Sequence, residues 1–515
     1  MHKNNESIIS QFFDNMDWEG ADYINNLLVN HNQDSPISSH EGYQEAVSGI
    51  EFKPVQSSPS ACNDVLNEIE NIILPGSINM GSPLFIGHMT TLLPNFTKSV
   101  SALITAMNQN IVKIETSKVL THYERIVISQ MHQLIFGESD EVYSNGIIDS
   151  ELTFGAITAG GTTANVMALH IARNKAVNGI AEQGLNTLNN KSVVICSELA
   201  HYSIKKAMDV LGLGINNLVT IPVNDHQKIN LKILKSTIAE LRSNDVNIIA
   251  LVGIAGSTEC GSVDPLEEIG QIAQVNRIHF HVDAAWGGGF IFSDEHKHLL
   301  RGIELANSVT LDPHKQLYVP MGIGMLLFKD TRIADNVQHT AQYTIRKNSF
   351  DLGQRTHEGS RPANSLYLYT AIKLMGKEGY EELINTSLNR TLELKSIIDN
   401  SEEFEMISEP QLNILLYQYI PEKYRGVDTL TLDEAAICEI NSFNENLQTK
   451  QFNSGKSFVS RTTLTIKSKS KYKLVCLRVV MANPMTKTKH LNQVIQHQKT
   501  IAMELETSVL FENYS

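Results

Sequence analysis

Short apolar runs alternate with segments of helical periodicity through the middle of the chain. The strand-like runs cover residues 192–197, 218–223, 247–256, 279–285, 308–313 and 324–329. The segments between them are long enough for crossover helices. Apolar strands separated by helices predict a mostly parallel sheet that is covered by helices on both faces. Ligands bind such sheets beyond the carboxyl ends of the strands.

The pattern on either side of this region predicts two further parts. Residues 1–60 are polar and contain one amphipathic piece, so we expect residues 1–80 to form an N-terminal arm with a helical segment. Residues 81–364 are predicted to form the large domain. Residues 365–515, with the strand-like runs LNILLYQY and YKLVCLRVVMANP, predict a smaller α+β domain. Within it, residues 441–470 are rich in Asn, Ser, Thr and Lys and are predicted to be an irregular insertion or mobile loop.

Composition excludes several classes of partner. The 515 residues carry a net charge of −14. We expect neither a nucleic acid nor a membrane surface as partner, because an acidic chain without a Lys/Arg block binds both poorly. No apolar run is long enough to span a bilayer, and the start lacks a signal-peptide pattern. The five scattered cysteines argue against a disulfide scaffold or a metal site. We therefore expect a cytoplasmic protein.

Glycines, hydroxyls and ionisable residues follow the predicted strands. In TAGGTTAN, Gly160 and Gly161 allow a tight turn, and threonines begin a helix whose free N–H groups suit an anion. Taken alone, this is most simply a glycine turn with an N-cap. His201, Asp283 and Lys315 each stand just beyond other strands. Taken alone, each of these residues also has a structural explanation, such as a surface histidine or a helix cap.

One cofactor needs this whole set on one rim of a sheet. Pyridoxal 5′-phosphate has a phosphate to cradle, a flat ring to sandwich and a ring nitrogen that a carboxylate keeps protonated. Its aldehyde is held as an imine by a lysine, which explains why Lys315 lies in an apolar corner of the sequence. The combination therefore predicts a pyridoxal-phosphate enzyme.

The ordered motifs TAGGTTAN, SELAHYS, AGST, VDAAWGG, DPHK and LRVVMANP resemble those of the group II pyridoxal-phosphate-dependent amino-acid decarboxylases. The resemblance implies an α/β fold of the aspartate-aminotransferase type (fold type I). Its large domain would contain a mostly parallel seven-stranded sheet. It further implies a homodimer with active sites at the interface. FIGHMTTLLP, YTIRKNSFDLG and EGSRP look like the bacterial subgroup that decarboxylates aspartate.

The resemblance also implies a role for each site residue. Lys315 would form the Schiff base, Asp283 would pair with the ring nitrogen, and His201 would stack on the ring. The remaining cofactor contacts would be Ala285 against the other ring face, Gly161 and Thr162 at the phosphate, Thr258 near the ring substituents and His314 close to the phosphate. Arg478 would bind the substrate, gripping its α-carboxylate with the guanidinium fork.

One departure concerns the proton that replaces the lost carboxylate. Relatives carry a tyrosine on a mobile loop for this step, and Gln354 falls at or near that position. An amide cannot act as a general acid. Tyr343, His357 and His201 are the candidates, and Tyr343 is the predicted catalytic residue.

The expected reaction is α-decarboxylation of a small acidic amino acid, L-aspartate giving β-alanine and CO2. Glutamate and cysteine sulfinate stay open as substrates. An aldehyde-lyase or an oxidative deaminase on the same cofactor is the rival activity, and a non-catalytic relative is a third possibility. Retention of Lys315, Asp283 and His201 together argues against the last of these.

Overall fold

A computed structural model of the chain describes residues 50–512, apart from 188–190, 342–344 and 347, and also describes positions 23, 24, 27, 37, 38, 42, 45, 47 and 48. Its contacts divide the chain into two compact units. The large unit comprises residues 87–444 and 461–484, and the small unit comprises residues 1–86, 445–460 and 485–515. The domain boundaries predicted from the sequence stay predictions. No helix in the described part of the chain is both long and apolar enough to span a bilayer.

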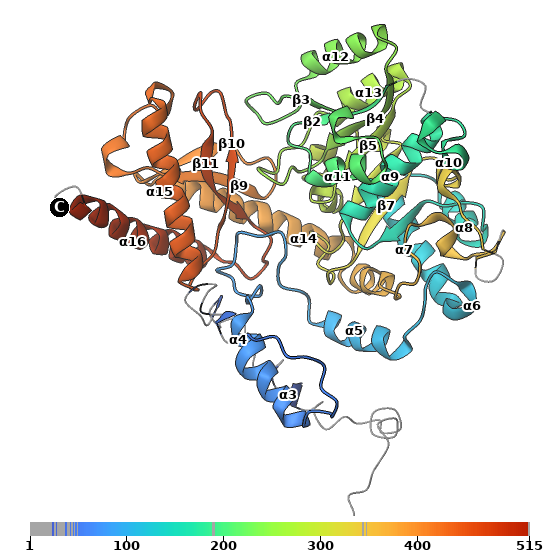
Figure 1. Cartoon of the computed structure of the whole chain (residues 1–515), viewed down its shortest axis with the longest axis horizontal. Coiled ribbons are helices and arrows are strands. Elements are labelled where there is room, and N and C mark those ends of the chain that lie inside the picture. The colour runs from blue at the N-terminus through green and yellow to red at the C-terminus, as the bar shows by residue number, and fades with distance from the viewer. Residues whose placement is uncertain are drawn as a thin grey trace, which may run out of the picture. The chain divides into compact units, whose positions relative to one another are not determined.

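The large unit is built on a seven-stranded sheet with the strand order β1-β7-β6-β5-β4-β2-β3 (Figure 1). Its strands are β1 (Gly155–Thr158), β2 (Ser192–Ser197), β3 (Leu218–Ile221), β4 (Asn247–Ile254), β5 (His279–Asp283), β6 (Ser308–Leu311) and β7 (Gly324–Phe328). The pairs from β3 to β6 are parallel, and β7 runs antiparallel to both β6 and β1. The mostly parallel sheet predicted from the apolar runs is therefore confirmed.

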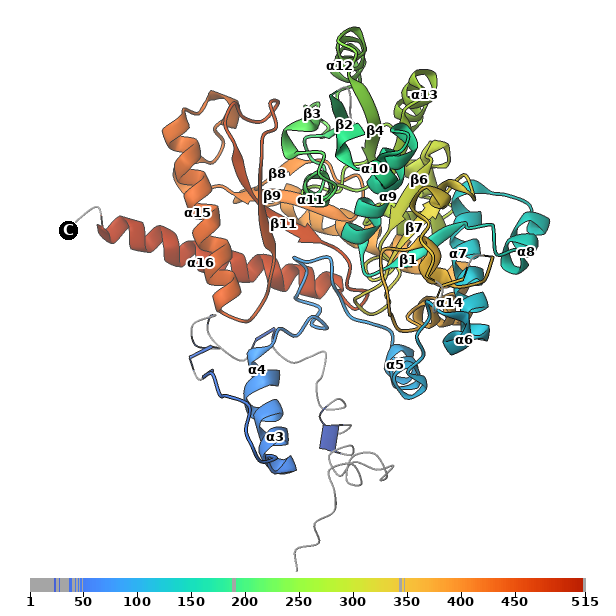
Figure 2. The same cartoon turned by 45° about the vertical axis from the view of Figure 1, so that its right-hand side comes forward.

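Alternation along the strands decides which helices cover which face. Val193 and Ile195 of β2 pack into a core with helices α7, α13 and α14. Their neighbours Val194 and Cys196 point the other way, into a core with α9 and α11. Successive side chains of a strand face opposite sides of a sheet, so both faces of this sheet are buried. Figure 2 lets the reader follow these helices around the sheet.

The helices of the described chain vary widely in length. They are α3 (Cys62–Glu68), α4 (Leu74–Gly76), α5 (Phe96–Met107), α6 (Ile114–Ser117), α7 (Val119–Phe136), α8 (Asp140–Ile148), α9 (Gly161–Ala176), α10 (Ile180–Gln183), α11 (Tyr202–Val210), α12 (Leu231–Ser243), α13 (Leu266–Asn276), α14 (Ser365–Asp399), α15 (Glu434–Asn453) and α16 (Thr488–Glu512). Gly376 has φ 62° and breaks α14 into two helical pieces, because glycine adopts this left-handed conformation without steric cost.

A second sheet of four strands has the order β10-β11-β9-β8. Its strands are β8 (Phe404–Ser408), β9 (Ile414–Tyr419), β10 (Ser460–Leu464) and β11 (Leu474–Val480). β9 pairs antiparallel with both β8 and β11. The two strand-like runs predicted after residue 365 correspond to β9 and β11.

The expectation of an irregular insertion or mobile loop at residues 441–470 is wrong. Helix α15 continues to Asn453, and β10 follows at Ser460–Leu464. Asn444 is fully buried, and its side-chain amide both accepts from the Tyr419 N–H (2.8 Å) and donates to the Tyr419 carbonyl (2.9 Å). Buried amides of this kind satisfy backbone groups, so a polar composition here does not indicate a loop.

Candidate active site

Three of the hollows in the large unit differ in size and position. The largest, about 870 Å³, lies at the amino-terminal ends of β4 and β5. Its cations include Lys175, Arg242 and Arg277, which stand at the carboxyl ends of helices, where positive charge offsets the helix dipole. The smallest, about 30 Å³, is far too small for a cofactor. The third, about 380 Å³, lies beyond the carboxyl ends of the parallel strands, where ligands bind this kind of sheet.

This third cavity brings together the predicted cofactor-binding residues. Its lining includes Gly161, Thr162, His201, Thr258, Asp283, Ala285, His314 and Lys315. They come from five separate segments, each of which lies at the end of a strand or begins a helix. The roles assigned to them stay predictions, but their common location is what those roles require.

Lys315 follows β6 in a tight turn, closed by a hydrogen bond from its N–H to the Asp312 carbonyl (2.9 Å). Its side chain is 21% exposed, and Nζ lies 2.9 Å from Oδ2 of Asp312, which is almost completely buried. The Lys315 ammonium is therefore paired with a carboxylate, and this ion pair offsets the desolvation cost of a partly buried charge. Tyr318 then turns the chain back with φ 53°, and its hydroxyl donates to the Ala482 carbonyl (2.8 Å). That hydrogen bond and the burial of the ring offset the strained backbone.

Helix α9 begins directly at the cavity. The first intrahelical bond is from the Ala164 N–H to the Gly160 carbonyl (3.1 Å). The N–H groups of Gly161, Thr162 and Thr163 precede it and have no backbone partner among the described residues. Unpaired N–H groups and the positive end of the helix dipole favour an anion at this position.

Asp283 ends β5 with its carboxylate buried and held by two N–H donors. The Asn165 amide donates to Oδ2 (2.8 Å), and the Ala285 N–H donates to Oδ1 (3.1 Å). No lysine or arginine in the described part of the chain forms an ion pair with it. A carboxylate accepts more than two hydrogen bonds, so Asp283 retains the capacity to bind a cationic N–H group from a ligand.

A chain of buried hydrogen bonds extends from Asp283 in two directions through Asn165. The Asn165 amide also donates to the Ser203 hydroxyl (2.9 Å), which lies 2.8 Å from Nδ1 of His201. In the other direction, Oδ1 of Asn165 lies 3.0 Å from Nε2 of His281. Burial lowers the pKa of His281 to about 4, so its ring is neutral and donates from Nε2. One amide thus orients both the carboxylate and the histidine of the cavity.

His201 lines the cavity as a neutral ring. Its Nδ1 accepts from the Ser203 N–H (3.3 Å), so the ring proton sits on Nε2. The pKa of His201 lies below its ordinary value, mainly because of burial. Lys315 acts in the same direction, and the carboxylates of Asp283 and Asp312 oppose it. A neutral ring is suited to stacking on a flat ligand.

Arg478 lies on β11, 7% exposed, and is not among the residues that line the cavity. Its guanidinium NH1 approaches the Gly87 carbonyl (3.4 Å), two residues before Met89, which does line the cavity. Burial lowers the pKa of Arg478 to about 10, so it stays charged at neutral pH. His88 lies between Gly87 and Met89 in the sequence. The pKa of His88 lies below its ordinary value because its ring is partly withdrawn from water and because Arg478 and Lys315 repel a positive charge.

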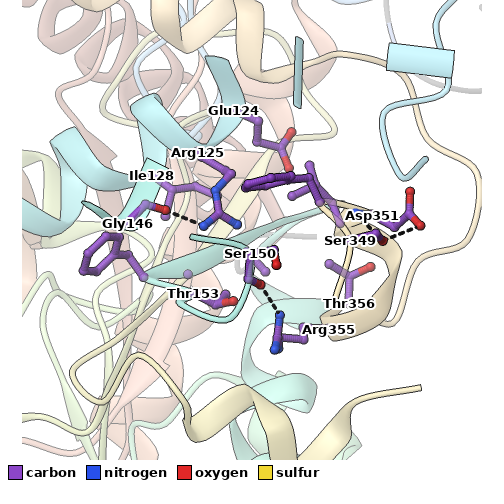
Figure 3. Close-up of a pocket in the computed structure, with 15 residues that line it drawn as sticks. Glu124, Arg125, Ile128, Gly146, Ser150, Thr153, Ser349, Asp351, Arg355 and Thr356 are labelled. Carbon is purple, nitrogen blue, oxygen red and sulfur yellow. Dashed lines mark hydrogen bonds between the residues drawn. The ribbon is translucent and has the colours of Figure 1, made fainter. Parts of the chain in front are cut away.

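The loop around Gln354 is held by its own hydrogen bonds. The Gln354 amide donates to the Ser349 carbonyl (2.9 Å) and accepts from Gln338 (2.8 Å), and the residue is 2% exposed. It does not line the cavity. Figure 3 shows the 30 Å³ hollow beneath this loop, where Asp351 accepts from Ser349 and Arg355 donates to the Ser150 carbonyl. These contacts favour a structural role for the loop on this side.

The three candidate proton donors differ in their position relative to the cavity. Tyr343 lies outside the described residues. His357 hydrogen-bonds His170 (2.9 Å between ring nitrogens) and is not part of the cavity lining. His201 does line it.

Sequence reasoning missed four polar residues of this site. They are His88, Asn165, Ser203 and Asp312. Each lies inside a motif that had been singled out, so the signal was present: a polar side chain at a fixed place in FIGHM, TAGGTTAN, SELAHYS and DPHK. The contact between Asn165 and Asp283 could not be read from the sequence, because these residues are separated by more than a hundred positions.

The comparisons with known proteins agree with this geometry. The profile of the family described as "pyridoxal-dependent decarboxylase conserved domain" matches residues 50–420. An aspartate 1-decarboxylase of Aliivibrio fischeri is 41% identical over 467 residues, 88% of this chain and 85% of that protein. An L-2,4-diaminobutyrate decarboxylase of Acinetobacter baumannii is 28% identical over 81% of both chains. A crystal structure of mouse CSAD in apo form superposes with a TM-score of 0.82, at 21% identity, over 93% of this chain and 99% of that one.

Fold, cavity and comparisons together define an enzyme that uses pyridoxal 5′-phosphate. The chain belongs to the pyridoxal-dependent decarboxylase family and is an amino-acid carboxy-lyase. The fold is fold type I, as the resemblance implied.

The residues of the cavity fit this cofactor. The N–H groups at the start of α9, which have no backbone partner among the described residues, suit its phosphate. Asp283 forms no ion pair with a lysine or arginine in the described part of the chain and suits its ring N–H, and Lys315 lies in the same hollow for the covalent bond. When bound, pyridoxal phosphate supplies a ring that accepts the electron pair left on the substrate α-carbon as CO2 departs. In this fit the chain would contribute the charge that keeps that ring protonated, through Asp283, whose carboxylate accepts a hydrogen bond from the Asn165 amide.

Gly161→Ala tests the close packing at the start of α9. An added Cβ would lie 2.7 Å from Oδ2 of Asp312, and that carboxylate is itself held by Lys315. We expect about 1–3 kcal/mol loss of stability from this overpacking and at least ~10-fold weaker cofactor binding. Gly359→Ala is the matched control, since its Cβ would meet nothing within 4 Å. Thermal unfolding and cofactor titration of both variants check this, and equal behaviour of the two would contradict it.

Proposed function

We propose that this enzyme decarboxylates L-aspartate to β-alanine and CO2. The single observation that carries an acidic substrate is Arg478, a buried and charged guanidinium that approaches the Gly87 carbonyl, two residues before the cavity-lining Met89. Glu259 acts electrostatically on this guanidinium, and a charged guanidinium beside a cavity is suited to binding a carboxylate of the substrate as well. The 41% identity to an aspartate 1-decarboxylase over most of both chains supports aspartate in particular.

An acidic amino acid carries two carboxylates, and charge considerations choose between them. The α-carboxylate leaves as neutral CO2, so a guanidinium bound to it would stabilise a charge that disappears in the transition state and would slow the reaction. The side-chain carboxylate keeps its charge throughout. Arg478 therefore serves the side-chain carboxylate, in place of the α-carboxylate to which the sequence pattern assigned it.

Other residues of the chain set the charge of the cofactor ring and supply the proton that replaces the lost carboxylate. Asp283 maintains the charge of the cofactor ring, and Asn165 keeps that carboxylate aligned. After CO2 has left, the α-carbon takes up a proton from a group at the cavity. His201 and Tyr343 are the candidates that remain, and Gln354 is not, because its amide is engaged in the loop.

Product analysis tests the proposal directly. The purified protein, loaded with cofactor, is incubated separately with aspartate, glutamate, cysteine sulfinate and 2,4-diaminobutyrate, and the products are identified by mass spectrometry. We expect β-alanine and CO2 from aspartate at the highest kcat/KM, with Lys315→Ala as the inactive control. A higher kcat/KM for another acid would reassign the substrate. Aldehyde plus ammonia as the main products would indicate the lyase or deaminase activity.

Arg478→Ala distinguishes the two carboxylate assignments. β-Alanine lacks the α-carboxylate but keeps the other one, so it is the diagnostic inhibitor. We expect its inhibition constant to rise by ~10²-fold in Arg478→Ala and by less in Arg478→Lys, as for loss of a charge-assisted bidentate pair. The absorbance of the bound cofactor should not change. If aspartate KM rises while β-alanine inhibits as before, Arg478 holds the α-carboxylate.

His88 adds a pH-dependent part to substrate binding. Its pKa lies below the ordinary value, so the ring is neutral at neutral pH and gains a positive charge as the pH falls. A positive ring beside Arg478 attracts an acidic side chain, so KM for aspartate should fall as the pH is lowered below the ordinary histidine pKa of about 6.5. In His88→Gln this change in KM should be lost, while the cofactor affinity stays. An unchanged pH profile in the variant would exclude His88 from the substrate site.

A homodimer completes the site in this proposal. Tyr202 and Met321 line the cavity yet are 65% and 62% exposed, and large apolar side chains at the rim of a site favour cover by a partner. Sedimentation equilibrium should give twice the chain mass of 57.3 kDa. Met321→Glu should weaken the association and lower activity together. A fully active monomer would refute the dimeric site.

A further inference from the structure

Asp312 carries a buried charge that its surroundings satisfy only in part. It follows β6 and is 6% exposed. Oδ2 lies 2.9 Å from Lys315 Nζ and 3.8 Å from His314 Nε2. Oδ1 is buried and has no hydrogen-bond partner in the described part of the chain. Buried charged oxygens without a partner are rare in folded proteins and require an explanation.

The position of the Asp312 carboxylate explains why one of its oxygens has no partner. A Cβ on Gly161, the first residue of α9, would lie 2.7 Å from Oδ2 and 3.1 Å from Oδ1, so Asp312 lies directly against the helix N-terminus. That terminus, with its free N–H groups, is where the cofactor phosphate is expected to bind. His314 stays fixed beside both, since its Nδ1 lies 2.7 Å from the Ile323 carbonyl. The chain therefore places an anion of its own beside the site that is suited to the phosphate anion.

We propose that the negative charge of Asp312 limits how tightly the chain retains its cofactor, because this carboxylate lies at the start of α9 and repels the cofactor phosphate. In the cofactor-free chain, Asp312 is the counter-charge of Lys315 and benefits from the positive end of α9. When phosphate occupies the helix terminus, its negative charge and that of Asp312 repel each other at short range. Asp312 thereby stabilises the cofactor-free chain and weakens cofactor retention.

Asp283 offers the matched comparison within the same cavity. Both residues are aspartates beyond neighbouring strands, and both line the hollow. Asp283 is held by Asn165 and the Ala285 N–H, and it faces the place of the ring nitrogen. Removing its charge changes the net charge of the cavity by the same amount as removing that of Asp312. A specific rivalry at the phosphate site therefore predicts different results for Asp312→Asn and Asp283→Asn.

The test uses inorganic phosphate, pyridoxal 5′-phosphate and pyridoxal as probes of the cofactor-free full-length chain. Dissociation constants come from calorimetry or fluorescence titration, and stability comes from thermal unfolding without ligand. In Asp312→Asn we expect inorganic phosphate and pyridoxal 5′-phosphate to bind about 10-fold tighter, as for removal of one nearby like charge. Pyridoxal, which lacks the phosphate, should gain much less. The cofactor-free variant should unfold at a lower temperature, because Lys315 has lost its counter-charge.

Three results would overturn the inference. Weaker or unchanged phosphate binding in Asp312→Asn would mean that the carboxylate does not oppose the phosphate. An equal gain in Asp283→Asn would mean that only the overall field of the cavity matters. An equal gain in affinity for pyridoxal would mean that Asp312→Asn acts through Lys315 and not through the phosphate.

The inference rests on the assignment of Lys315 and the start of α9 as the cofactor site, and a separate measurement checks that assignment. Borohydride reduction followed by peptide mass analysis should place the cofactor on Lys315 in the wild-type chain. Attachment elsewhere would refute the site, whereas attachment at Lys315 with no gain in Asp312→Asn would refute only the rivalry.

Discussion

The carboxylate of Asp283 is the constraint on which the site depends. It is buried, its predicted role is to bind a protonated ring nitrogen as a carboxylate, and the described chain offers it N–H donors in place of a cation. A buried ionised group is costly unless hydrogen bonds replace its water. Asn165 provides that replacement, and the same amide reaches His201 through Ser203. The two groups expected to contact the cofactor ring are thus oriented by one side chain.

The neutral histidines around this carboxylate follow from the same burial. Burial lowers the pKa of His281 to about 4 and that of His279 to about 3. Both rings are therefore uncharged and can extend the hydrogen-bond chain from Asn165 to Ser308 without competing with the cofactor for the Asp283 charge. His279, His281 and Asp283 alternate along β5 and so share one face of the strand. The direction of β5 therefore leads this row of hydrogen-bonded side chains to the cavity.

Much of the fold was predictable because its signals are local. Apolar runs mark six of the seven strands of the large sheet to within a few residues, and parallel strands leave their carboxyl ends on one rim. Residues just beyond those ends, such as Thr258, Asp283 and Lys315, were therefore expected together. The extension of α15 was not predictable in this way, since Asn444 is polar yet fully buried, where it completes the hydrogen bonding of Tyr419.

The residues that the sequence did not reveal are those defined by contact between distant segments. Asn165 belongs to a helix and Asp283 to a strand, and only the packing of α9 on the sheet brings them to 2.8 Å. Asp312 was near Lys315 in sequence, but the turn that places its carboxylate on the lysine also presses it against Gly161, more than a hundred residues earlier. Cofactor contacts can be read from strand ends, whereas the groups that tune those contacts depend on tertiary packing. That difference is physical: the first set is fixed by backbone direction, the second by which side chains remain unsatisfied once the elements have packed.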